Sequence, residues 1–374
     1  TVQRWERGER EPQPWQRSRI AEVLNVTAGE LDDLLHAGAE IEQPLSASSW
    51  TTVAVAGDGD EFEAWELMRR VQSSDVGPET LDRLELAFDE LAIAYPVTPP
   101  QELLQRVRQH LSYVSHLLDA KKSLREHRRL LVVGGWLSLF GATLHIDLKQ
   151  ENSATARLQA AAALARQAEH PEIEAWCFET EAWRVLTAGD YSRAVELSQL
   201  GQSAAPTGSS AAIQSTAQEG RARARLGQSR ETYSAIDRVQ GMVSSLVRPD
   251  RPEHHYRYDP EKSLAYTATT LAWLGDMAAE SYAREVIERL SPSGDVSKWP
   301  RRVASANIDL ALVLLKGDRL DEACDAAQKA ILSGRVVPSN HWRALEVVKA
   351  VEARQLPEAP DLREVYQGLK GLGS

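Results

Sequence analysis

The side chains that could recognise a ligand directly are concentrated at the start of the chain. Gln3, Arg4 and Arg7 are long hydrogen-bonding residues on a short helical pattern that ends at Gly8. Glycine often ends a helix because it adopts the left-handed conformation. On a short helix in the major groove of DNA, one bidentate arginine contact to a base edge discriminates by about 1–3 kcal/mol. A solvated amphipathic helix would have the same spacing, so both interpretations remain open on spacing alone.

Two further helices are predicted directly after this segment. Pro14 suits the first turn of a helix, where its missing N–H costs nothing. Thr27 and Glu30 have the spacing of a capping box, and Val26 and Leu31 have that of a hydrophobic staple. These signals agree with one another and predict a compact module of three helices.

The residue order of this module resembles a known family. The segment TVQRWERG is followed by a loop with proline, then by IAEVLNV and by TAGELDDLL. This order is similar to the second half of Cro/repressor-like (XRE) helix-turn-helix domains, in which a helix ending in W/Y-E-x-G precedes helices reading LA..L.V and T..EL..LL. The resemblance implies that residues 1–36 are the C-terminal part of such a DNA-binding domain, and that its first helices are missing from this sequence.

The resemblance also implies roles for individual side chains. Thr1 and Arg4 match groove-facing positions of the recognition helix, and Gln3 is expected to reach a base or a phosphate. Arg7 and Arg10 are expected to contact phosphates, which position a protein on DNA without reading its sequence. The net charge of −11 argues against a surface that coats nucleic acid, but it is compatible with a small DNA-reading head on an acidic body.

The rest of the chain is expected to be a linker followed by a helical body. Residues 37–60 are rich in glycine, serine and alanine, which predicts the linker. From residue 61 to residue 374, apolar residues recur at helical spacing and β-type alternation is missing. The predicted fold class is therefore all-α.

A repeat within this body predicts its architecture. The clearest unit has small residues and a turn glycine at the spacing of a tetratricopeptide (TPR) unit, with Ala182 as its anchor. Weaker copies have anchors at Gly220, Ala268 and Ala311, which gives spacings of 38, 48 and 43 residues. The TPR consensus is about 34 residues, so these repeats are divergent. We predict a TPR-like helical-repeat superhelix, in which stacking of the units supplies the core.

Such a superhelix presents a concave surface that is lined mainly by the first helix of each pair. Numbering from the anchors places nine side chains there: Trp176, Glu179, Trp183, Gln214, Arg221, Arg225, Lys262, Thr269 and Trp273. This mixture of tryptophan and arginine could form a groove for an anionic or peptide ligand. Packing of tryptophans between repeats, with a salt-bridged exterior for the arginines, would explain the same pattern.

The sequence offers no sign of an enzyme. It contains none of the common nucleophile, phosphate-binding or metalloprotease motifs, so no catalytic residue and no cofactor are predicted. His254 and His255 could share a metal in a loop, but no third ligand follows at the usual spacing, and no metal site is predicted. Cys177 and Cys324 suggest no disulfide framework, which favours the reducing cytoplasm. No apolar run of 18 residues is present, so no membrane span is expected.

The complete arrangement resembles actinobacterial regulators that join an XRE head to a TPR-like sensor body, and its layout is similar to that of the Rgg/PlcR/NprR group. The resemblance implies a cytoplasmic, nucleoid-associated homodimer that binds a double-stranded DNA operator. It also implies a body that senses a small-molecule or peptide effector. The alternative is a TPR interaction scaffold that sequesters or inhibits a partner protein, and an operator-binding assay separates the two.

Overall fold

The computed structural model describes residues 67–68, 74–291 and 297–371. Contacts divide the chain into two units, residues 1–70 and 71–374, and almost all described residues belong to the second unit. The expected helix-turn-helix module at 1–36, with its five DNA-contacting residues, and the expected linker lie outside the described residues. The fold below is that of the second unit.

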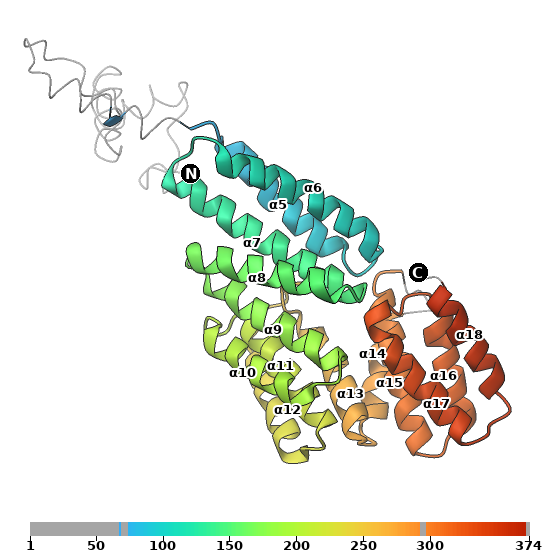
Figure 1. Ribbon diagram of the computed structural model, residues 1–374. Coiled ribbons are helices and arrows are strands. Elements are labelled where there is room, and N and C mark those ends of the chain that lie inside the picture. Colours follow the sequence, from blue (N-terminus) through green and yellow to red (C-terminus); the bar gives the residue numbers. More distant parts are fainter. Residues whose placement is uncertain (1–66, 69–73, 292–296, 372–374) are drawn as a thin grey trace, which may run out of the picture. The chain divides into compact units, whose positions relative to one another are not determined.

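The described part of this unit is built from helices and contains no strand, so the predicted all-α, helical-repeat fold is confirmed (Figure 1). Its α-helices are α5 (Pro78–Ala94), α6 (Pro100–Asp119), α7 (Leu124–Asp147), α8 (Glu151–Gln167), α9 (Pro171–Thr187), α10 (Tyr191–Ala204), α11 (Ser210–Arg225), α12 (Ser229–Val243), α13 (Pro260–Leu274), α14 (Ala279–Leu290), α15 (Pro300–Lys316), α16 (Leu320–Leu332), α17 (His341–Ala353) and α18 (Ala359–Gly371). A short 3-10 helix, η4 (Pro338–Asn340), precedes α17.

The helices from α9 to α16 form four pairs in two layers. Each helix packs against the next along the chain, and the first helices of the pairs, α9, α11, α13 and α15, also pack against one another. The four small anchors lie on these first helices, and Ala182 and Ala311 are completely buried. A Cβ atom added at Gly220 would lie 3.2 Å from that of Ala235 on α12, so the small residue permits close approach within the pair.

Helix α7 is the core of the N-terminal part of this unit. An 18-residue window of α7 has a mean hydropathy of 1.5, and 89% of that window is buried inside the protein. By length and composition this helix could cross a membrane, although the sequence has no uninterrupted apolar run of that length. Because α5, α6, α8 and α9 pack around it, α7 has the burial of a core helix.

The long loop between α12 and α13 inserts an aromatic side chain into this core. The ring of Tyr256 lies 5.1 Å from the rings of Trp136 and Trp176 and 5.9 Å from that of Phe88, centroid to centroid. Its hydroxyl group lies 3.1 Å from Oγ1 of Thr143 on α7. The loop therefore joins α5, α7 and α9 to the repeats that follow it.

A second long-range connection, which we call the closing contact, consists of Tyr95, Asp147, Arg301 and Ser339. Nη1 of Arg301 at the start of α15 donates to Oδ2 of Asp147 at the end of α7, over 2.9 Å. The hydroxyl groups of Tyr95 and Ser339 donate to the same carboxylate over 2.8 and 3.2 Å. The end of α7 is thus joined directly to the fourth helix pair and to η4.

Because Tyr256 connects the loop to the core, shortening its side chain should lower the stability of the protein considerably. Tyr256→Ala should lower the free energy of unfolding by about 3–5 kcal/mol, because it removes a fully packed ring. The measurement is urea-induced unfolding, followed by circular dichroism. Tyr113→Ala on α6 is the control, since Tyr113 is 47% exposed and should cost less than about 0.5 kcal/mol. Equal effects of the two substitutions would contradict the anchoring role of Tyr256.

Candidate ligand-binding cavity

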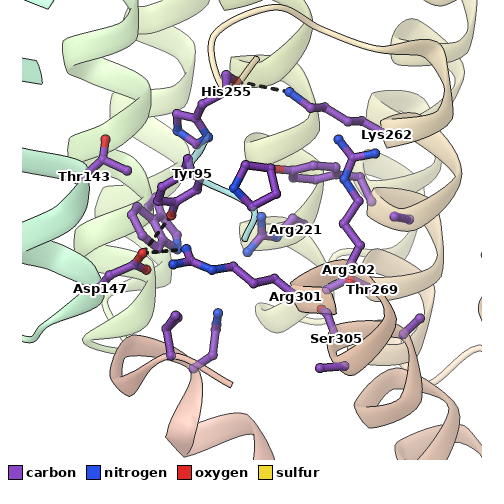
Figure 2. Close-up of a pocket in the computed structure, with 18 of the residues that line it drawn as sticks. Tyr95, Thr143, Asp147, Arg221, His255, Lys262, Thr269, Arg301, Arg302 and Ser305 are labelled. Atoms are coloured by element: carbon purple, nitrogen blue, oxygen red, sulfur yellow. Dashed lines mark hydrogen bonds and ion pairs between the residues drawn. The ribbon is translucent and has the colours of Figure 1, made fainter. Parts of the chain in front are cut away.

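A cavity of about 240 Å³ lies between the first helices of the four pairs and the closing contact. Its walls include Trp176 on α9, Gln214 on α11, Lys262 on α13 and Ser305 on α15. Tyr95 and Asp147 of the closing contact form another part of the wall (Figure 2). The cavity is therefore assembled from several repeats and from the end of α7.

Seven of the nine side chains expected on the concave surface line this cavity: Trp176, Glu179, Trp183, Gln214, Arg221, Lys262 and Thr269. Arg225 and Trp273 do not line it. They pack against Arg221, Trp342 and each other beside the cavity wall. The fold therefore brings together most of the residues that were expected on the concave surface. Binding of a ligand by them remains a prediction.

Several charged side chains that line the cavity could not be predicted from the sequence, above all Arg301, Arg302 and Arg343. One signal was present. The offset from anchor to inner-face residue that selects Trp176, Gln214 and Lys262 also selects Ser305 when it is applied to Ala311, and Ser305 lines the cavity. No such offset leads to the arginines, which lie at the start of α15 and on α17.

Most charged groups of the cavity are held by buried partners. The carboxylate of Asp309 is 1% exposed, and it accepts hydrogen bonds from Oγ1 of Thr269 and from Nη2 of Arg343. Nη1 of Arg302 donates to the buried carboxylate of Asp259 over 3.2 Å. Buried charges need such partners, so these pairs fix the positions of the arginine side chains.

One wall of the cavity is backed by alternating aromatic rings and guanidinium groups. The guanidinium of Arg221 lies 5.1 Å from the ring centroids of both Tyr266 and Trp273. Arg225 follows, at 4.7 Å from Trp273 and 4.8 Å from Trp342. Cation–π contacts of this kind are attractive and position planar side chains. Arg225 and Trp273 therefore lie behind Arg221, and neither of them lines the cavity.

Two further cavity groups have strongly shifted pKa values. Burial raises the pKa of Glu179 from 4.5 to about 7, and the hydrogen bond from Gln214 opposes this shift. Burial and the neighbouring Arg302 lower the pKa of Lys262 from 10.5 to about 7. The ammonium group of Lys262 donates to the carbonyl oxygens of His255 and Arg257 (Figure 2 shows the first of these bonds). Both groups can therefore change charge near neutral pH.

The two adjacent histidines connect the long loop between α12 and α13 to helix α5. Nε2 of His254 lies 3.1 Å from Oδ1 of Asp89, and the backbone N–H of His255 donates to the carbonyl oxygen of Ala92 over 3.1 Å. The His255 ring lies 4.5 Å from that of Tyr95, centroid to centroid. Within the described ranges, no group of three or more histidine, cysteine, aspartate or glutamate residues could hold a metal ion.

Glu179 predicts a pH dependence of stability. Because its pKa is raised in the folded state, stability falls as the pH rises from about 4.5 to about 7, by up to about 3 kcal/mol. Glu179→Gln should abolish this part of the profile, whereas Glu196→Gln, at an exposed carboxylate, should leave it in place. The measurement is the free energy of unfolding in urea at several pH values. An unchanged profile in the Glu179→Gln variant would exclude the raised pKa.

Comparison with known protein families and with curated protein sequences finds no match for this chain. The function proposed below therefore rests on the residues of the chain and on the geometry of the cavity.

Proposed function

We propose that this protein is a DNA-binding transcriptional regulator whose helical-repeat body senses a small ligand. The DNA-binding part of the proposal is supported by the helix-turn-helix resemblance of residues 1–36. The sensing part is carried by one observation, the cavity on the inner side of the repeats, which is lined by seven of the nine residues expected there. No catalytic role is proposed for these residues.

The construction of the cavity suits a sensor. A ligand inside it would touch helices of several pairs and residues of the closing contact at once. Such a ligand shifts the arrangement of the repeats only if it binds one arrangement more tightly than another. The closing contact is the structural element through which a change of curvature would be favoured or opposed.

In this proposal the protein acts in the cytoplasm as a homodimer on a two-fold related operator. The half-sites would lie about one turn of DNA apart, roughly 34 Å, or a multiple of that distance. Arg4 would read base edges, together with Thr1 and Gln3. Arg7 and Arg10 would hold the phosphate backbone, and the repeat body would set the distance between the two DNA-binding heads.

The alternative, a scaffold that sequesters a partner protein, has less support. A scaffold of the repeat class uses its extended concave surface for binding. Here Asp147 and Arg301 of the closing contact and His255 of the long loop are themselves part of the cavity wall. The cavity that remains suits a small ligand better than a segment of a partner protein.

The proposal predicts specific DNA binding by the protein expressed from its complete gene. Selection from a random duplex library at moderate salt should enrich a two-fold related site. Arg4→Ala should weaken binding to that site by at least about fivefold, or about 1 kcal/mol, and relax its specificity. Arg10→Ala should weaken binding to all sequences similarly. Arg193→Ala, in an exposed ion pair of α10, is the control and should bind normally. Failure to enrich any site would refute the regulator.

A further inference from the structure

Two cavity arginines, Arg221 and Arg335, form no ion pair with a described residue, and of these Arg335 is exposed and donates to the carbonyl oxygen of Val97. Three arginines surround the ring of Trp273 at 4.7–5.3 Å, namely Arg221, Arg225 and Arg343. Arg225 is paired with Glu346, and Arg343 is paired with a carboxylate of the cavity wall. Arg221 makes no hydrogen bond or ion pair with any residue that the structure describes, and its Nε is buried. Its direct contacts are with aromatic rings, and the carboxylates of Glu179 and Asp309 act on its charge only at longer range.

A second unpartnered group lies on the same helix. Gln218 precedes Arg221 by three positions on α11, so the two side chains share a helix face, and both line the cavity. Gln218 is completely buried, yet neither Oε1 nor Nε2 has a hydrogen-bond partner within the described residues. Burying an amide without partners costs free energy, and a ligand in the cavity would recover part of that cost.

No described carboxylate of the cavity wall forms an ion pair with Arg221. Asp147, Asp309 and Glu253 are each paired with another cation. Glu179 accepts a hydrogen bond from Gln214 and has no direct contact with Arg221. A ligand with a negatively charged group would therefore supply an ion-pair partner for Arg221 and a hydrogen-bond partner for Gln218.

The remaining walls indicate the rest of the ligand. The indoles of Trp176 and Trp183 are flat apolar surfaces at the cavity. A volume of about 240 Å³ is below the range of roughly 300–1,000 Å³ that is usual for drug-sized ligands. The ligand is therefore a compact molecule rather than an oligopeptide.

We propose that the cavity binds a small organic oxyanion, whose carboxylate or phosphate group lies against Arg221 and Gln218 and whose flat apolar part lies against Trp183. Carboxylates and phosphates share the chemistry that a guanidinium group recognises, since both accept two parallel N–H bonds. The role of this ligand as an effector rests on the proposed regulatory function. Its binding to the cavity does not.

The test uses isothermal titration calorimetry on the full chain, with three ligands of one ring each: benzoate, phenyl phosphate and the uncharged benzamide. At least one of the two acids should bind at least tenfold more tightly than benzamide, and the tighter acid identifies the preferred group. Arg221→Gln should weaken its binding at least tenfold. Arg193→Gln, which removes the same charge from an exposed position on α10, should bind it as the wild type does.

A second variant separates recognition from folding. Gln218→Leu should raise the Tm of the ligand-free protein, because it removes an unpartnered amide, and should weaken binding of the preferred acid severalfold. The proposal is overturned if neither acid binds better than benzamide, or if both acids bind Arg221→Gln as tightly as the wild type. Failure of specific DNA binding with intact binding of an acid would reject the regulator but not the oxyanion site.

Discussion

Asp147 on α7 and Arg301 on α15, which lie 154 residues apart in the chain, form a largely buried ion pair. The carboxylate is 1% exposed, and two hydroxyl groups complete its hydrogen bonding. A buried ion pair stabilises a fold only when such additional bonds offset the loss of solvation. Here those bonds come from Tyr95 and Ser339, so that four separate segments of the chain meet at one carboxylate. Three residues of this contact, Tyr95, Asp147 and Arg301, are part of the cavity wall.

The chemistry of the cavity follows from the same constraint. Closing the repeats places several cations near one another, and each needs a partner because little solvent reaches it. Arg301, Arg302 and Arg343 have carboxylate partners, whereas Arg221 is held by the rings of Tyr266 and Trp273. This difference makes one position of the wall receptive to an anion. The proposed sensor function depends on that position and on its connection to the closing contact.

Much of this fold could be predicted from local patterns. Helical periodicity and four small anchors identified the repeats, and one offset from the anchors selected Trp176, Gln214 and Lys262, which all line the cavity. The closing contact could not be predicted, because helix periodicity says nothing about which distant segments meet. Tyr256 was missed for the same reason, since its loop follows no period. The DNA-binding roles proposed for residues 1–36 lie outside the described residues and stay predictions.

A double-mutant cycle at the closing contact tests the central claim that this ion pair closes the repeat body. The free energies of unfolding of the wild type, Asp147→Asn, Arg301→Gln and the double variant would be measured in urea at one pH. The account predicts that the sum of the two single-variant losses of unfolding free energy exceeds the loss in the double variant by about 1.5–3 kcal/mol, as expected for directly interacting groups. Additive losses, within about 0.5 kcal/mol, would contradict it.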